Sequence, residues 1–176
     1  IEFLAMWVFS VLFGCSSTKN NISDNHPIHS LVDSKSFEFT ADWANPMVTQ
    51  SMNAVANSGL IPPGSNVARI NLAGNPNFIK VIGDSVSANL PYFGERQFGG
   101  GYGSATGIKF DGIPEGYEQT FDTDKGKYHI SFTMKDKSDN YLVTMAIYPN
   151  KSTTVSVNLS NRNSIRYEGI IKTIEK

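Results

Sequence analysis

The sequence predicts an all-β fold in which antiparallel strands follow one another as a meander and form a barrel. Three observations support this prediction. Apolar and polar residues alternate over several short stretches, the links between these stretches are short and rich in turn residues, and no sustained 3.6-residue apolar stripe indicates a long helix. The late run of hairpin-like links favours a barrel over a β-sandwich, which is the alternative.

Alternation of apolar and polar residues defines the first predicted strand, residues 36–43. Its apolar face would carry the side chains of Phe37, Phe39, Ala41 and Trp43. Residues 47–57 are the best helix candidate, although their apolar positions are few. Shorter strand candidates lie at residues 67–72, 78–82, 85–90, 105–110 and 117–122.

Three late stretches alternate in the same way and are linked by turn residues: 128–134, 154–159 and 164–174. We expect their core side chains to be Tyr128, Ile130, Phe132, Val155, Val157, Ile165 and Tyr167. Arg166 and Glu168 would face solvent. Residues 141–148 are apolar on both faces, which predicts a central strand or a strand covered on both sides. Antiparallel neighbours in this order are typical of an up-and-down, lipocalin-like barrel.

Length and composition indicate one globular domain, which we place at residues 36–176. The chain has 176 residues, with 15 Lys and Arg against 16 Asp and Glu, so its formal net charge is −1. A nearly neutral chain lacks a strongly basic surface, and we therefore expect no nucleic-acid partner. The single cysteine, Cys15, excludes an internal disulfide.

The N-terminal residues are typical of a bacterial lipoprotein signal peptide, which we place at residues 1–14. Residues 3–13 are almost wholly apolar, and Gly14 and Cys15 follow them. A small residue before a cysteine resembles a lipobox, in which the cysteine becomes lipid-modified and forms the new N-terminus. Phe13 is bulkier than the usual lipobox residue and no Lys or Arg precedes the apolar run, so we expect the translation start to lie upstream. A buried strand or helix with a chance cysteine is the alternative.

Residues 15–35 are polar and aperiodic, which predicts a flexible tether between a lipid on Cys15 and the domain. His26 and His29 would be solvated in this tether rather than bind a metal. Ser16 differs from the Asp that is associated with inner-membrane retention, and no acidic cluster near the cysteine resembles a surface-export signal. We therefore expect an outer-membrane lipoprotein that faces the periplasm and contacts the membrane through its lipid anchor.

No catalytic constellation emerges from the sequence, so we expect a protein that is not an enzyme and that uses no metal or cofactor. Residues 99–107 are rich in glycine, but neither a Lys-Ser/Thr pair nor a helix pattern follows them, which argues against nucleotide binding. His129 lies on the polar face of its predicted strand, as a half-exposed strand histidine would. The acidic residues within 111–124 fit a solvated face better than a carboxylate pair or a calcium loop.

The stretch "LPYFGERQFGGGYG", residues 90–103, places aromatic side chains and one cation among glycines. The candidate ligand-binding residues within it are Tyr92, Phe93, Arg96, Phe98 and Tyr102. The aromatic side chains would line a binding mouth, and Arg96 would hold a carboxylate, a phosphate or a sugar. In the alternative, the aromatic side chains only plug the end of the barrel. We expect an irregular loop over residues 94–103, with Leu90 and Phe93 buried beneath it and Arg96 exposed.

Five short motifs of the domain form a set: Asp84-Ser85-Val86, Asn89-Leu90-Pro91-Tyr92-Phe93-Gly94, Gly101-Tyr102-Gly103, Gly107-Ile108-Lys109-Phe110 and the closing stretch 161–169. Together they resemble the Bacteroidetes family called domain of unknown function 4251. The resemblance covers residues 36–172 and implies a secreted, mostly lipidated, all-β protein with no assigned activity. Asp84-Ser85-Val86 also resembles a short acceptor pattern for O-glycosylation at Ser85, and a turn that enters a strand is the alternative.

These features lead to one expected function and one alternative. We expect an envelope lipoprotein that acts as a binding module for a small amphipathic or glycan ligand near residues 91–103. The alternative is a structural or interaction protein of the cell envelope that binds no small ligand. A cavity beside Tyr92 and Arg96 would favour the first function, and a filled barrel with an exposed aromatic patch would favour the second.

Overall fold

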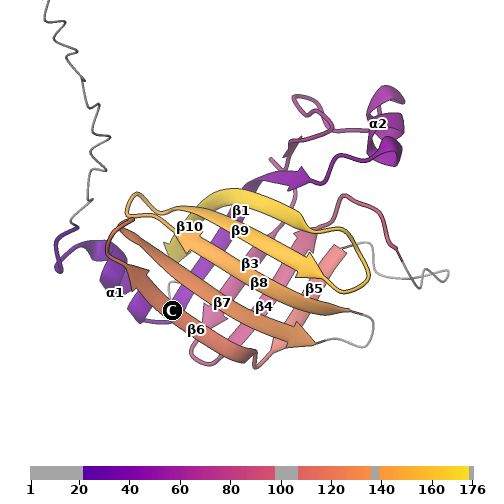
Figure 1. Ribbon diagram of the computed structural model, residues 1–176. Helices are drawn as coiled ribbons and strands as arrows, with labels where there is room; N and C mark the ends of the chain where they lie inside the picture. Colours follow the sequence, from indigo (N-terminus) through magenta and orange to yellow (C-terminus); the bar gives the residue numbers. More distant parts are fainter. Residues whose placement is uncertain (1–21, 98–106, 136–138, 175–176) are drawn as a thin grey trace, which may run out of the picture.

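The structure is a computed structural model that describes residues 22–97, 107–135 and 139–174. One antiparallel sheet curls into a half-barrel (Figure 1), which confirms the predicted all-β, barrel-like fold. The sandwich alternative is wrong, because a sandwich needs two packed sheets. The strands are β1 Ser36–Pro46, β2 Ile70–Asn71, β3 Phe78–Ile82, β4 Ser85–Pro91, β5 Gly107–Gly112, β6 Glu115–Asp122, β7 Lys127–Lys135, β8 Asn140–Ile147, β9 Ser152–Leu159 and β10 Ile165–Thr173.

The strand order across the sheet is β5-β4-β3-β1-β10-β9-β8-β7-β6, and β2 pairs with β1 outside this path. Strands that follow one another in the chain are neighbours within each flank, as the short turn-rich links predict. The two flanks meet where β1 pairs with β10 in the middle of the sheet. β5 and β6 form the two edges, and in the described part of the chain no backbone pairing closes the sheet between them.

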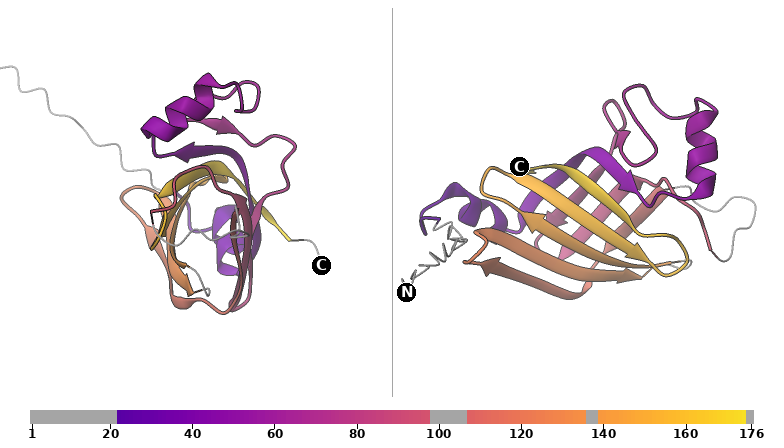
Figure 2. Two further views of the ribbon diagram at one scale, coloured as in Figure 1. Left: turned by 90° about the vertical axis from the view of Figure 1, so that its right-hand side faces the viewer. Right: turned by 45° about the horizontal axis from the view of Figure 1, so that its top comes forward.

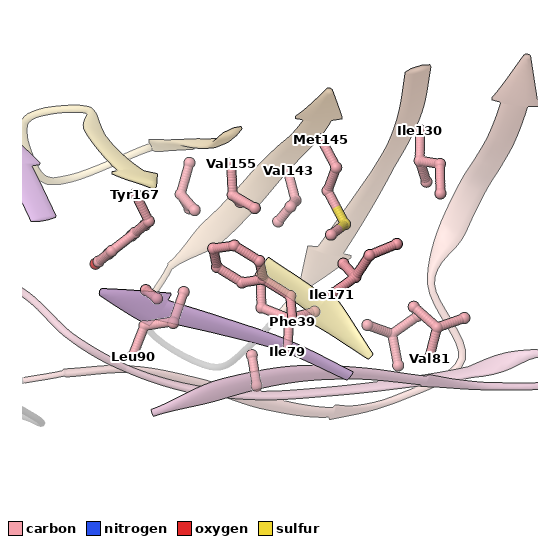
Figure 3. Close-up of a cluster of buried hydrophobic side chains, with 14 of the residues drawn as sticks. Phe39, Ile79, Val81, Leu90, Ile130, Val143, Met145, Val155, Tyr167 and Ile171 are labelled. Carbon is pink, nitrogen blue, oxygen red and sulfur yellow. The ribbon is translucent and has the colours of Figure 1, made fainter. Parts of the chain in front are cut away.

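Apolar side chains from both walls of the half-barrel fill its interior (Figure 3). Phe39 and Ile79 lie on one wall and face Val143 and Met145 on the other. The seven side chains predicted for the core are all exposed by 5% or less, which confirms the phase of these strands: Tyr128, Ile130, Phe132, Val155, Val157, Ile165 and Tyr167. The interior described by these residues is therefore a core of buried apolar side chains.

β1 changes its inward face halfway along its length. Ala41 is buried as predicted, but the pairing register with β10 shifts between Ala41 and Trp43, and burial then moves to Ala44. Trp43 consequently lies only partly buried, with the Arg69 guanidinium 4.3 Å from the centroid of its ring. The predicted inward position of Trp43 is wrong because one extra residue in a bulged strand reverses the alternation beyond it.

β8 is covered on one face only. Tyr141, Val143, Met145 and Ile147 are buried, whereas Leu142 between them is 46% exposed. β8 is a central strand between β7 and β9, which confirms one of the two predictions for this stretch. The other prediction, a strand covered on both faces, is wrong because a single curled sheet buries only its concave face. An apolar residue on the outer face is ordinary for a soluble domain and does not by itself indicate a second layer.

Helix α1, Pro27–Asp33, lies within the segment predicted as a tether (Figure 2). Ile28, Leu31 and Val32 of this helix are buried against the core, and the Nδ1 atom of His26 accepts a hydrogen bond from the Ile28 N–H group at the N-terminus. The prediction of a flexible tether over residues 15–35 is therefore wrong from α1 onward. The packed part of the chain includes α1 and begins before residue 36.

Helix α2, Gln50–Asn57, confirms the helix candidate, although it starts later than the predicted range. The Thr49 side chain caps it by accepting a hydrogen bond from the Met52 N–H group. The helix projects from the sheet at the end opposite α1 (Figures 1 and 2). We call α2 and its flanking residues, 47–60, the α2 lobe. Four large apolar side chains are exposed in it: Met47, Val48, Val55 and Leu60.

Candidate functional site

The chain turns away from the sheet directly after β4. Pro91 is the last residue of β4 and pairs with Gly107 at the start of β5. Leu90 is 1% exposed, as predicted, and packs into the core. Tyr92 and Phe93 are only partly buried against the core, so the predicted burial of Phe93 is wrong. Both aromatic side chains therefore keep part of their surface available at this end of the barrel.

Tyr92 is held in a defined position. Its hydroxyl lies 2.9 Å from the carbonyl oxygen of Asn163 and 3.2 Å from that of Glu95, and the Arg162 guanidinium lies 5.3 Å from the centroid of its ring. Burial raises the pKa of the Tyr92 hydroxyl and outweighs the opposing charge of Arg162. The hydroxyl therefore stays protonated at neutral pH and acts as a hydrogen-bond donor.

A groove of about 450 Å³ opens beside these aromatic side chains, and we call it the Tyr92 groove. It combines apolar surface from leucine, proline and aromatic side chains with two amides and one ammonium group. Its lining residues are Leu60, Pro62, Asn75, Pro76, Asn89, Leu90, Pro91, Tyr92, Phe93, Gly107 and Lys109. Four segments that are distant in sequence supply these residues, so the groove exists only in the folded chain.

Arg96 lies outside the Tyr92 groove. Its side chain is 18% exposed, and its Nη2 atom lies 3.6 Å from Oδ2 of Asp139, whose side chain is fully buried. The same carboxylate oxygen lies 3.0 Å from Nη2 of Arg162, which is only 3% exposed. The prediction of an exposed Arg96 is wrong because Asp139 draws both cations into a buried ion cluster. Arg96 is thus partly buried beside Asp139 and does not line the Tyr92 groove.

Hydrogen bonds to two other segments of the chain hold the segment that carries Arg96. Arg96 forms an antiparallel bridge with Arg162, and the Gln97 N–H group donates to the carbonyl oxygen of Asn161 at 2.8 Å. On the other side, the Thr49 hydroxyl donates to Oε1 of Glu95 at 2.7 Å. The described residues 94–97 are irregular, as predicted, yet these hydrogen bonds hold them against the body of the domain.

Three of the candidate functional residues predicted from the sequence lie outside the described residues. They are the lipidation candidate Cys15 and the aromatic candidates Phe98 and Tyr102. Of the five ligand-binding candidates, the structure brings Tyr92 and Phe93 together in the Tyr92 groove and separates Arg96 from them.

Lys109, Asn75 and Asn89 also line the groove, although they were not among the candidates predicted from the sequence. The signal for Lys109 was available, because alternation in β5 places it outward and the pairing of β4 with β5 sets it opposite Asn89. The positions of Asn75 and Pro76 depend on the turn before β3. No local pattern places that turn beside Tyr92.

A second polar cluster joins α1 to the barrel. The Tyr128 hydroxyl lies 2.8 Å from Nδ1 of His29 and 3.2 Å from Oδ1 of Asp33. The His29 ring also contacts Phe121 edge to face, with 4.9 Å between centroids, so the predicted solvation of His29 is wrong. Burial raises the pKa of Tyr128 to about 12, and the Asp33 charge adds to the increase. A protonated tyrosine of this kind is a structural donor that holds α1 in place.

Among residues 22–97, 107–135 and 139–174, no group of three or more His, Cys, Asp or Glu side chains is arranged to hold a metal ion. In the same part of the chain, no helix combines the length and apolar character needed to cross a membrane.

A protein-family model described as "Domain of unknown function (DUF4251)" matches residues 20–171. The chain belongs to the DUF4251 family. The match includes α1 and every strand up to Ile171 in β10, which agrees with a DUF4251 domain that begins before residue 36. A search of curated proteins finds no match to the chain.

Proposed function

We propose that this DUF4251 domain is a binding module of the bacterial cell envelope that holds a small amphipathic or glycan ligand in the Tyr92 groove. The observation that supports this proposal is the composition of the groove, in which flat apolar faces surround two amides and one ammonium group. Small-ligand sites commonly combine an apolar lining with a few polar groups that orient the ligand.

The side chains of the groove suit a ring that has one apolar and one polar side. Tyr92 and Phe93 offer aromatic faces, on which the C–H face of a sugar or a short aliphatic chain can lie. Asn75 and Asn89 offer amides that can bond hydroxyl groups. The hydrogen bonds and ring contact that fix Tyr92 lower the entropy lost on binding, because its side chain is ordered before the ligand arrives.

We further propose that the protein is a lipoprotein of Bacteroidetes type, anchored in the outer membrane and facing the periplasm. The support is the apolar run of residues 3–13 followed by Gly14 and Cys15, together with the polar residues that follow the cysteine. In this arrangement the lipid on Cys15 holds the domain at the membrane. The chain before α1 then acts as the spacer.

Replacing Cys15 with Ala is expected to abolish lipid labelling and to release the domain from membranes. The thiol of Cys15 is the only one in the chain, so no other cysteine can carry the lipid. The measurement is metabolic labelling with an alkyne fatty acid, followed by membrane fractionation. Ser16→Ala is the matched control and should behave as the wild-type protein does. Absence of labelled lipid on the wild-type protein would refute the anchor.

The binding proposal is tested by purifying the protein from its native envelope and identifying bound molecules by native mass spectrometry. We expect wild-type protein to carry a ligand and Phe93→Ala protein to lose it, because Phe93 lines the groove and is only partly buried. Val48→Ser, which alters a residue that is 49% exposed on the α2 lobe, is the control. A wild-type protein without ligand, or equal retention by both variants, would contradict the proposal.

The α2 lobe favours the second candidate, a structural or interaction protein of the envelope. No charged residue lies between Asp42 and Arg69 in the sequence, and this interval contains the exposed side chains of Met47, Val48 and Val55. Large apolar side chains exposed in an uncharged segment are typical of a protein contact surface when they lie together. Loss of a co-purifying envelope protein from Val48→Ser, with no small ligand on the wild-type protein, would favour this second function.

A further inference from the structure

We infer that the ligand of the Tyr92 groove is an acidic saccharide whose carboxylate binds the Lys109 ammonium. This inference rests on the proposed binding function and specifies the class of its ligand. It follows from three features of the groove: its charge, the position of its amides relative to Lys109, and the cost of leaving those amides without partners.

Lys109 is the only charged side chain among the described residues that line the groove, and no carboxylate lines it there. Five other lysines of the described chain, in contrast, form ion pairs with Asp or Glu: Lys35, Lys80, Lys125, Lys135 and Lys172. Over residues 22–97, 107–135 and 139–174, no ion pair involves Lys109. The groove therefore offers one uncompensated positive charge to a ligand, and a carboxylate complements it.

Asp111 is the carboxylate nearest to Lys109 along β5 and lies on the same outer face of that strand. It lines a separate hollow of about 480 Å³, together with Phe110, Met134 and Lys135. Lys109 lines both hollows and stands between Asp111 and the Tyr92 groove. The acidic side chain thus lies beyond Lys109 and leaves the approach from the groove open to an anion.

Asn89 lies directly opposite Lys109 in the pairing of β4 with β5. Side chains of directly opposed residues stand on the same face of a sheet, with Cβ atoms about 5 Å apart. The Asn89 Nδ2 atom lies 3.5 Å from the carbonyl oxygen of Pro76, at the long limit of a hydrogen bond, and remains a good donor for a ligand. A uronic-acid ring carries a carboxylate beside hydroxyl groups, so one ring can bind both an ammonium and an amide that stand on the same face of a sheet.

The amides also distinguish a sugar from a fatty acid. An aliphatic carboxylate could place its charge at Lys109, but its chain would cover Asn75 and Asn89 without hydrogen-bonding them. Covering polar groups without partners is costly, whereas sugar hydroxyls can both donate and accept. The apolar faces of Tyr92 and Phe93 then contact the C–H face of the same ring. These features together favour an acidic saccharide.

The test is equilibrium binding of full-length protein to tetragalacturonate and a hyaluronan tetrasaccharide, each compared with its methyl ester, and to dodecanoate. The ester removes the charge and keeps the ring. We expect wild-type protein to bind each acid about tenfold more tightly than its ester at low ionic strength, and high salt to reduce the difference. Lys109→Gln should abolish the preference. Lys125→Gln, which removes an equal charge from a side chain that is 70% exposed, should retain it.

The outcomes separate this inference from the proposed function. If acids and esters bind equally and Phe93→Ala weakens both, the groove binds saccharides but the inferred role of Lys109 is wrong. If dodecanoate binds and no saccharide does, the groove binds amphipathic ligands and the inferred saccharide class is wrong. If none of the probes binds wild-type protein, the inference is overturned, while the envelope-purified protein and its Phe93→Ala variant still decide the proposed function.

Discussion

Replacement of Asp139 with Ala is expected to lower the free energy of unfolding by about 3–5 kcal/mol. The Asp139 side chain is fully buried and lies 3.0 Å from the Arg162 guanidinium, which is itself only 3% exposed. Removing the carboxylate takes this counterion from the buried Arg162 charge, which is far more costly than the loss of an exposed ion pair. Urea denaturation monitored by circular dichroism measures the change.

Two further variants show whether the effect arises from the buried charge. Asp84→Ala removes a carboxylate whose side chain is 88% exposed and should change stability by no more than about 0.5 kcal/mol. A double variant, Asp139→Leu with Arg162→Leu, should regain most of the lost stability, because no uncompensated charge remains at Arg162. If Asp139→Ala costs no more than Asp84→Ala, the ion cluster does not hold this end of the barrel.

Replacement of Phe132 with Ala is expected to cost about 3–5 kcal/mol of unfolding free energy. Phe132 is 1% exposed in the middle of β7. Its ring stacks on Tyr117, with 6.0 Å between centroids, and contacts Phe110 edge to face at 6.3 Å. Truncation removes these contacts and leaves a cavity that the surrounding sheet, with its fixed register, can only partly close.

The control for this variant lies in the same strand. His129→Ala changes an exposed residue of β7 and should alter stability by no more than about 0.5 kcal/mol. Both variants are measured by the same urea denaturation, and their m-values should agree if each unfolds in two states. A cost below about 1 kcal/mol for Phe132→Ala would contradict the burial of this face of β7.

Local alternation was sufficient to predict the strands of the second half of the domain. β7, β9 and β10 bury one face, so each second residue is apolar, and the core residues of these strands follow directly. Alternation failed at Trp43, where a bulge in β1 shifts the pattern, and at β8, where Leu142 is apolar on the outer face. Bulges and exposed apolar residues depend on the partner strands, which a single stretch of sequence does not identify.

α1 was missed although its sequence contains a helical signal. Ile28, Leu31 and Val32 have the i, i+3, i+4 spacing of one helix face, and Pro27 occupies a favourable first position. The helix has only seven residues, too few for its pattern to stand out in a polar segment, and isolated helices of that length are unstable. Its stability comes from packing against the barrel, including the contact of His29 with Tyr128.

The candidate site could be predicted only in part, because some of its residues are visible in the local sequence and others depend on contacts made across the fold. The aromatic character of Tyr92 and Phe93 is visible in the sequence, and both line the groove. The partial burial of Arg96 depends on its ion pair with Asp139. The position of Lys109 in the groove depends on the pairing of its strand with that of Asn89. These are long-range relations that appear only once the sheet is assembled.

Because β10 lies in the middle of the sheet, the sheet cannot be completed until the last of its strands has been made. β1 is the first strand to be made, yet Phe39 pairs with Ile171 of the last strand. Such a pairing closes a very long loop, and folds dominated by pairings of this kind form slowly. Until β10 arrives, β1 and β9 each present an open edge that can recruit other chains. A chain that ended before β10 would lose the strand that joins the two flanks, and not a dispensable strand at the edge.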